Sequence, residues 1–223
     1  MANETPSAAG REKIKAGFLR IVDPAARLLV RLDVRPNTLT GWGIVFSLLA
    51  GLLIGGGAFL AGLLAVALAG LSDVLDGNVA RLSGKDSRFG AFYDSVLDRY
   101  SEGFILTGLA WHFAGGPAFF GPPEAPSPGT VAVIVLAATG SFLVSYTRAR
   151  AEGLGISCKV GLLQRPERFV LILLALLCGA LPGWGYGLMK AVLVLLALLA
   201  NATAVQRILF LRRQLVGQES RNP

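Results

Sequence analysis

The sequence predicts an all-α integral membrane protein with six transmembrane helices preceded by an interfacial helix. Of its 223 residues, 53% are hydrophobic and only 16% are charged, which is too apolar for a typical soluble domain. The apolar residues form successive runs of roughly 20 residues, the length that an α-helix needs to cross a bilayer. Lys and Arg residues gather between alternate runs, as they do in multi-pass membrane proteins.

The first expected element precedes the spans and lies within residues 1–35, a cytoplasmic N-terminus. Apolar side chains recur at helical spacing among Lys and Arg over residues 10–34, a pattern typical of a helix in the membrane interface. Pro24 is expected to break this helix, and Asn37 or Thr38 to cap the first span. The polar start lacks the apolar segment of a signal peptide, so we expect the N-terminus to stay in the cytoplasm.

Six apolar segments follow, the fifth being the shortest. They are expected at residues 39–60, 62–81, 89–113, 130–150, 168–181 and 186–211. A proline-rich stretch at 117–128 cannot be helical throughout and is expected to be a connecting loop. The segments define a transmembrane domain of residues 36–212, followed by a polar C-terminal tail of residues 213–223.

The distribution of positive charge predicts the orientation of the spans. Lys and Arg concentrate in the N-terminus, the second and fourth connections and the C-terminal end, whereas the opposite connections hold only Lys190. Because short cytoplasmic loops carry the excess of positive residues, both termini and the two even-numbered loops are expected in the cytoplasm. The net charge of +7 then faces anionic lipid headgroups and does not indicate nucleic-acid binding.

Four aspartates interrupt the second and third expected spans. Their spacings of three and four residues place each pair on one helix face, and carboxylates inside a membrane usually pair, bind ions or line a wet cavity. Hard divalent cations such as Mg²⁺ or Mn²⁺ neutralise converging carboxylates, so the sequence predicts a site for one or two metal ions. In the alternative, a salt-bridged helix pair, nearby arginines neutralise them. The aspartates are Asp73, Asp76, Asp94 and Asp98, and the arginines are Arg81, Arg88 and Arg99.

Small residues accompany the aspartates. Gly77 and Gly90 leave room for a phosphate or a nucleotide to approach the backbone, and Arg81 is placed to pair with a phosphate. The complete pattern resembles the signature of the CDP-alcohol phosphotransferase family at every fixed position: Asp73-x2-Asp76-Gly77-x2-Ala80-Arg81-x8-Gly90-x3-Asp94-x3-Asp98. The resemblance extends to the six helices with a preceding juxtamembrane helix.

This resemblance implies a homodimeric enzyme that transfers a phosphatidyl-type group from a CDP-linked lipid, such as CDP-diacylglycerol, to an alcohol and releases CMP. It also implies roles for individual residues. Asp73, Asp76, Asp94 and Asp98 would bind two divalent ions, Mg²⁺ or Mn²⁺, and Asp98 would also deprotonate the acceptor hydroxyl. The CDP pocket would be shaped by Asn37, Thr40, Gly77, Ala80, Arg81 and Gly90.

The acceptor is inferred from three segments at the cytoplasmic ends of spans four to six. They resemble those of prokaryotic phosphatidylinositol-phosphate synthases, which implies that Ser145, Arg148, Arg168 and Arg207 hold the phosphate of inositol phosphate. Several cations around one dianion suit a phosphorylated acceptor. In the alternative, these arginines anchor helix ends to lipid. Arg148 stands where Lys is common in that branch.

Two other functions remain open at this point. Glycerol 3-phosphate is also anionic, so a phosphatidylglycerophosphate synthase is the second candidate, although Ser95 and Arg99 resemble the inositol-phosphate branch more. A divalent-cation transporter would need polar residues through the membrane depth, whereas spans four to six are nearly continuous apolar runs.

His112 is expected to be structural or interfacial, and Cys158 and Cys178 form no recognisable metal or disulfide motif.

Overall fold

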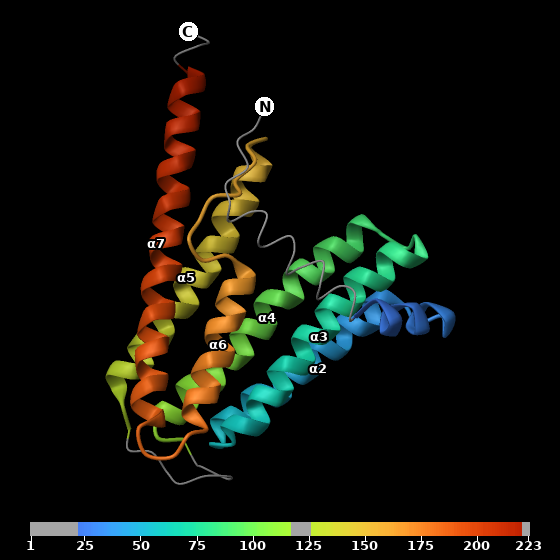
Figure 1. Ribbon diagram of the computed structural model, residues 1–223. Helices are drawn as coiled ribbons and strands as arrows, with labels where there is room; N and C mark the ends of the chain where they lie inside the picture. Colours follow the sequence, from blue (N-terminus) through green and yellow to red (C-terminus); the bar gives the residue numbers. More distant parts are fainter. Residues whose placement is uncertain (1–21, 117–125, 220–223) are drawn as a thin grey trace. The chain divides into compact units, whose positions relative to one another are not determined.

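The computed structural model describes residues 22–116 and 126–219, and the regular structure within these ranges is entirely α-helical (Figure 1). Residues 22–31 form one helix. The six helices that follow are α2 (Pro36–Gly55), α3 (Phe59–Ser83), α4 (Arg88–Phe113), α5 (Pro128–Gly153), α6 (Arg165–Gly179) and α7 (Gly185–Glu219). Most of the expected proline-rich loop lies outside the described residues.

Four of these helices, α2, α3, α5 and α7, are long and apolar enough to cross a membrane. The first half of α4 is rich in charged side chains, and α6 has only 15 residues. The described part of the chain is all-helical, and its four long apolar helices indicate a membrane protein. Residues 213–219 of the expected tail continue α7 without a break.

Two expected boundaries of the first span are wrong. The span was expected to continue to residue 60, but α2 ends at Gly55 and α3 begins at Phe59. Gly57 adopts a φ of 87° in the turn between them, a conformation that glycine tolerates and other residues avoid. At the other end, α2 begins at Pro36, so neither Asn37 nor Thr38 is its N-cap; proline suits the first helical position because its missing N–H is not needed there.

The described residues divide into two compact units. The first comprises the chain up to Phe46 together with Leu68–Tyr100, and the second comprises Ser47–Ala67 and the chain from Ser101 onward. Helices α2, α3 and α4 each contribute one half to each unit. The four aspartates belong to the first unit, and the arginines expected to bind the acceptor belong to the second.

In the first unit, the helix of residues 22–31 ends in a Schellman-type turn. Asp33 has a φ of 52°, and the Val34 N–H bonds to the Leu29 carbonyl at 3.0 Å, the pattern that satisfies carbonyls at a helix end. The Asp33 carboxylate accepts a hydrogen bond from Lys85 Nζ at 2.7 Å, which lowers the pKa of Asp33. Pro24 lies in the first described turn of this helix, and the segment before the expected break lies outside the described residues.

In the second unit, α7 is flanked by α5 and α6 (Figure 1). Glycines allow close helix contacts here: a Cβ added to Gly108 would clash with the Gly51 carbonyl oxygen, and one added to Gly140 would lie 2.9 Å from the backbone nitrogen of Asn201. Asn201 Nδ2 also donates to the Leu136 carbonyl at 3.0 Å, linking α7 to α5. Small residues and interhelical polar contacts are the usual basis of helix association in membranes.

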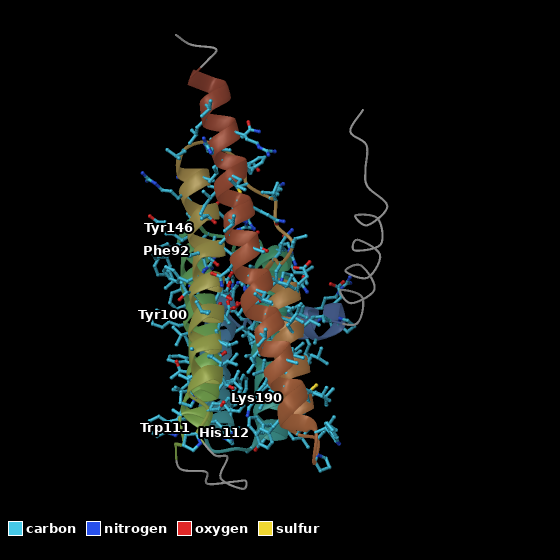
Figure 2. The ribbon with its side chains drawn as sticks, turned by 90° about the vertical axis from the view of Figure 1, so that its left-hand side faces the viewer. Phe92, Tyr100, Trp111, His112, Tyr146 and Lys190 are labelled. Atoms are coloured by element: carbon cyan, nitrogen blue, oxygen red, sulfur yellow. The ribbon has the colours of Figure 1, made fainter. Side chains whose placement is uncertain are left out.

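One end of the second unit holds an aromatic cluster around His112, which is 2% exposed. Its ring stacks on Tyr186 at 5.8 Å and meets Phe59 edge-on at 4.8 Å, while Lys190 lies 5.1 Å from the centre of the Phe113 ring. Figure 2 shows His112 and Lys190 at this same end. The packing fits the structural role expected for His112.

Candidate active site

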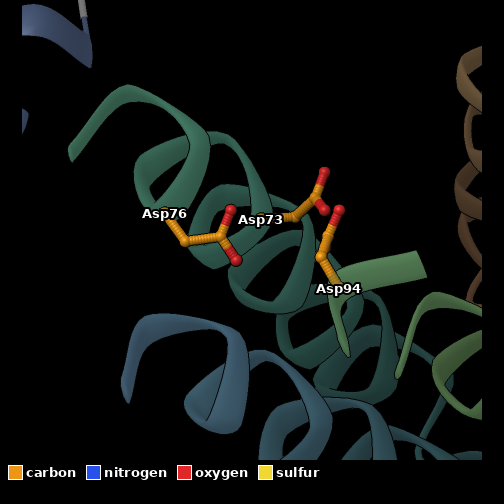
Figure 3. A group of neighbouring side chains, drawn as sticks. All are labelled: Asp73, Asp76 and Asp94. Carbon is orange, nitrogen blue, oxygen red and sulfur yellow. The ribbon is translucent and has the colours of Figure 1, made fainter. Parts of the chain in front are cut away.

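Three of the four aspartates come together in the first unit. Asp73, Asp76 and Asp94 each present a carboxylate oxygen, and these oxygens all lie within 4.8 Å of one another (Figure 3). Asp76 is 6% exposed, and the other two are partly buried. Three carboxylates this close repel one another strongly where water is scarce. A set made only of carboxylate oxygens fits a hard divalent cation such as Mg²⁺ or Mn²⁺ and lacks the nitrogen and sulfur ligands typical of zinc.

The α2 helix holds the most buried of these carboxylates. Thr40 Oγ1 donates a hydrogen bond to Asp76 Oδ2 at 2.7 Å and lies 3.2 Å from the Pro36 carbonyl. A hydroxyl has one proton to donate, and the shorter contact is the one to the carboxylate. This contact holds the Asp76 carboxylate in one orientation.

A cavity of about 480 Å³ lies beside this carboxylate group. It contains five of the six residues expected to bind the CDP group, together with Asp76 and Asp94. A Cβ placed on Gly77 would meet no atom within 4 Å, so the glycine faces open space, whereas one on Gly90 would lie 3.0 Å from Ser87 Oγ. The five expected residues in the lining are Asn37, Thr40, Gly77, Ala80 and Gly90.

The sequence reasoning missed the loop before α4 as part of this cavity. Lys85, Asp86, Ser87 and Arg88 all line it. Ser87 Oγ accepts a hydrogen bond from the Gly90 N–H at 2.9 Å, the contact of a helix N-cap. A serine three residues before a glycine at a helix start is the local signal that marks this loop, but it does not reveal that the loop faces a cavity.

Two expected site residues lie outside these groupings. Arg81 is exposed, donates to Asn78 Oδ1 and is absent from the cavity lining. Asp98 does not belong to the group of three carboxylates; its Oδ2 lies 3.7 Å from Arg99 Nη1. Arg99 also donates to Ser95 Oγ at 2.9 Å. Asp98 and Arg99 are neighbours on α4, so this contact does not form a bridge between two helices.

The arginines expected to bind the acceptor gather in the second unit. Arg148 and Arg168 both lie close enough to Arg207 to repel its charge. Arg168 forms two contacts with Glu102, at 3.0 Å each, and Arg148 pairs with Glu152 at 2.9 Å. Arginine side chains gathered in one unit are suited to binding an anion.

The fourth expected acceptor residue, Ser145, donates to the Ser141 carbonyl of its own helix at 3.3 Å. Arg207 is 3% exposed and donates to two backbone carbonyls, that of Val160 at 2.9 Å and that of Val144. Arg207 thereby connects α7 to α5 and to the loop before α6. This contact between distant segments was not predicted from the residues around Arg207.

A helical membrane protein with a carboxylate group suited to a divalent cation, beside a cavity whose lining includes charged side chains of both signs, has the features of a membrane enzyme for charged substrates. Residues 33–207 match the family described as CDP-alcohol phosphatidyltransferase. The chain belongs to this family of enzymes.

Curated relatives match most of the chain. The phosphatidylinositol phosphate synthase of Streptomyces avermitilis is 35% identical over 207 residues, which is 90% of this chain and 81% of the relative. The archaetidylinositol phosphate synthase of Methanothermobacter thermautotrophicus is 38% identical over 198 residues, 88% of this chain and 91% of the relative.

Solved structures agree with the fold. The crystal structure of Mycobacterium tuberculosis phosphatidylinositol phosphate synthase with CDP-DAG bound has a TM-score of 0.75 and 32% identity, covering 85% of this chain and 92% of that one. Another crystal structure of the same enzyme, in complex with manganese and citrate, has a TM-score of 0.73 at 32% identity, covering 84% and 87%.

Proposed function

We propose that this protein transfers a phosphatidyl group from CDP-diacylglycerol, or a related CDP-lipid, to inositol phosphate and releases CMP. One observation carries the proposal: carboxylate oxygens of Asp73, Asp76 and Asp94 lie within 4.8 Å of one another, beside a cavity that Gly77 also lines. A Cβ at Gly77 would meet no atom within 4 Å, so the backbone there is open to a substrate. The similarity to synthases that make inositol phosphate lipids supports the choice of acceptor.

In the proposed mechanism, Asp73, Asp76, Asp94 and Asp98 hold two divalent ions, Mg²⁺ or Mn²⁺. Bound ions would screen the pyrophosphate and the charge that develops on the departing CMP. Thr40 keeps the Asp76 carboxylate in one orientation, and Gly77 leaves room for a phosphate beside the backbone. Of the six expected CDP-binding residues, Arg81 needs a change of side-chain conformation to contribute, because it contacts Asn78 in this structure.

Asp98 is proposed as the base. It accepts the proton of the acceptor hydroxyl as the new oxygen–phosphorus bond forms, and the bond between that phosphorus and CMP breaks. The proton, the phosphatidyl group and the CMP anion are then all accounted for without another reactant. Arg99, 3.7 Å from Asp98, supplies a positive charge next to this carboxylate.

The acceptor is proposed to be anionic because Arg148, Arg168 and Arg207 gather in the second unit. Ser145 lies on α5 one residue after Val144, whose carbonyl contacts Arg207, and would add a hydroxyl to the same group. Two of the arginines have carboxylate partners already. Glycerol 3-phosphate would also satisfy this charge, so the two acceptors must be compared directly.

The proposed membrane topology has six crossings with both termini on one side. Helices α4 and α6 complete six crossings, and both termini and the active site face the cytoplasm, since Lys and Arg concentrate on that side. The domain limits are those expected from the sequence: residues 1–35, 36–212 and 213–223. A homodimer is proposed from the family resemblance and can be tested by light scattering of the detergent-solubilised protein.

The decisive experiment measures CMP release by purified protein with CDP-diacylglycerol and Mg²⁺ or Mn²⁺. Inositol 1-phosphate, inositol 3-phosphate, glycerol 3-phosphate, inositol and serine are compared as acceptors, with Asp98→Asn as the inactive control. Turnover with inositol phosphate that is absent in the variant supports the proposal. Turnover with glycerol 3-phosphate alone would show that glycerol 3-phosphate, and not inositol phosphate, is the acceptor. Unchanged activity of Asp98→Asn would show that Asp98 is not the base.

A further inference from the structure

A bidentate ion pair connects α4 to α6 in the second unit. Arg168 Nε lies 3.0 Å from Glu102 Oε1, and Arg168 Nη2 lies 3.0 Å from Glu102 Oε2. The arginine side chain is 4% exposed and the glutamate side chain 18% exposed. A fork of this kind fixes the plane of the guanidinium as well as its position. Sequence reasoning assigned a role to Arg168 but none to Glu102.

The backbone of Arg168 is held independently of this pair. The start of α6 carries a capping box in which Gln164 and Glu167 satisfy each other's backbone N–H groups, and the Arg168 N–H bonds to the Gln164 carbonyl at 3.1 Å. A capping box fixes the first helical turn. The conformational freedom that remains at Arg168 is therefore in its side chain, and Glu102 restricts it.

The pairing leaves one side of the guanidinium free to bind an anion. Arginine has five N–H donors, and Glu102 contacts the nitrogens Nε and Nη2. One proton of Nη1 and the second proton of Nη2 form the end edge of the guanidinium, which has the geometry for two hydrogen bonds to a phosphate. Arg207 differs, because backbone carbonyls accept from its Nε and Nη1.

The ion pair also neutralises one of the positive charges in this part of the second unit. Arg148 and Arg168 both act against the positive charge of Arg207. In the described part of the chain, Glu102 beside Arg168 is more buried than Glu152, which is 53% exposed beside Arg148. A buried guanidinium without a counter-charge would turn away or bind water. Glu102 keeps Arg168 in place when no acceptor is bound.

We infer that Glu102 is a positioning residue that orients the Arg168 guanidinium toward the phosphate of the acceptor. The inference rests on the proposed function, because it takes the acceptor to be a phosphorylated alcohol. It does not make Glu102 a catalytic residue, since Glu102 acts on the reaction through Arg168.

The test compares the steady-state kinetics of Glu102→Gln with those of the unmodified protein. Glutamine keeps the length of the side chain, but its NH₂ group cannot accept the second hydrogen bond. The KM for inositol phosphate is expected to rise about tenfold, the loss of one hydrogen bond between charged groups, while the KM for CDP-diacylglycerol stays within about twofold. Glu102→Asp keeps the charge on a shorter side chain and is expected to give a smaller rise.

Glu167→Gln is the matched control. It removes a carboxylate next to Arg168 in the sequence, yet glutamine still serves in a capping box, so both KM values are expected to stay within about twofold. Inorganic phosphate gives a second readout: as a competitor of inositol phosphate, it is expected to inhibit Glu102→Gln about tenfold less strongly than the unmodified protein.

The outcomes separate the inference from the function on which it rests. Unmodified protein that does not use inositol phosphate overturns the proposed acceptor. If the unmodified protein uses it, an unchanged acceptor KM in Glu102→Gln overturns the positioning role alone, as does an equal rise in both KM values with a lower melting temperature. If the glutamine variant does not fold, the same comparison is made with Glu102→Asp, for which a selective rise in acceptor KM supports the inference and its absence overturns it.

Discussion

Thr40 Oγ1 donates a 2.7 Å hydrogen bond to Asp76 Oδ2, so a residue at the start of α2 holds a carboxylate in the middle of α3. The two residues are 36 positions apart in the sequence. Carboxylates that bind metals are commonly oriented by such hydrogen bonds. The position of Asp76 therefore depends on α2 as well as on its own helix.

Removing the Thr40 hydroxyl is expected to weaken metal-dependent activity. Thr40→Val keeps the shape of the side chain but leaves Asp76 without this donor, and loss of such a partner typically costs about tenfold to a hundredfold in metal affinity or activity. Thr40→Ser retains the hydroxyl and serves as the control. Rates of CMP release measured across a Mn²⁺ titration test this, and identical metal dependence in Thr40→Val and the unmodified protein would contradict it.

The three clustered carboxylates are expected to bind a divalent cation together. Asp73→Asn, Asp76→Asn and Asp94→Asn should each lower activity by about a hundredfold or more, because each removes a charged ligand. Electron paramagnetic resonance of bound Mn²⁺ gives a readout that is independent of turnover. Asp86→Asn is the control, because Asp86 lines the same cavity but does not belong to the group of three carboxylates. If Asp86→Asn lost Mn²⁺ binding to the same extent, Asp73, Asp76 and Asp94 would not by themselves define the metal site.

Gly77 is expected to leave room for the substrate and not to stabilise the fold. A Cβ at this position meets no atom within 4 Å, so Gly77→Ala should fold and even gain up to about 1 kcal/mol from its higher helix propensity. The added methyl occupies the cavity wall, so the KM for CDP-diacylglycerol should rise.

The control for this experiment is Gly103→Ala. Gly103 is an exposed helical position in α4, and its Cβ also meets nothing within 4 Å. Its melting temperature should rise without any change in KM. A Gly77→Ala variant with raised stability and unchanged kinetics would contradict a lipid substrate at this wall.

Local sequence patterns predicted the parts of this protein that depend on one helix at a time. The spacing of three residues predicted that Asp73 and Asp76 share one helix face, and their carboxylate oxygens lie within 4.8 Å of each other. The apolar runs located the six helices, but the expected ends at residues 60 and 211 differ from Gly55 and Glu219 in the structure. The turn at Gly55–Gly57 was missed because its residues are as apolar as the span they end. A hydropathy pattern cannot reveal that Gly57 adopts a positive φ.

Contacts between distant segments could not be predicted in this way. Nothing in the sequence near Arg168 indicates Glu102, which lies 66 positions earlier, and nothing near Arg207 indicates the Val160 carbonyl. Arg207 was expected to bind the acceptor from its charge and its resemblance to the family. Which of its nitrogens are already used by the protein depends on tertiary structure alone.

Arg207 is expected to stabilise the loop before α6 as well as to serve the acceptor. Beside its own bonds to the Val160 and Val144 carbonyls, α7 contributes Thr203 Oγ1, which accepts from the Leu163 N–H at 2.9 Å. Arg207→Lys keeps the charge, but one ammonium group cannot reproduce the two directed bonds of a guanidinium. Leaving buried carbonyls unsatisfied costs about 1–3 kcal/mol each.

The measurements that check this are thermal unfolding and limited proteolysis of the loop at residues 154–164. Arg207→Lys should unfold at a lower temperature and be cleaved faster in this loop. Gly161→Ala should show the same cleavage although it leaves every arginine in place, because its backbone has a φ of 140° and its Cβ would lie 2.5 Å from Thr203 Cγ2. If Arg207→Lys raised the acceptor KM and left stability and cleavage unchanged, Arg207 would act on the acceptor alone, and the contacts with the loop would carry no measurable energy.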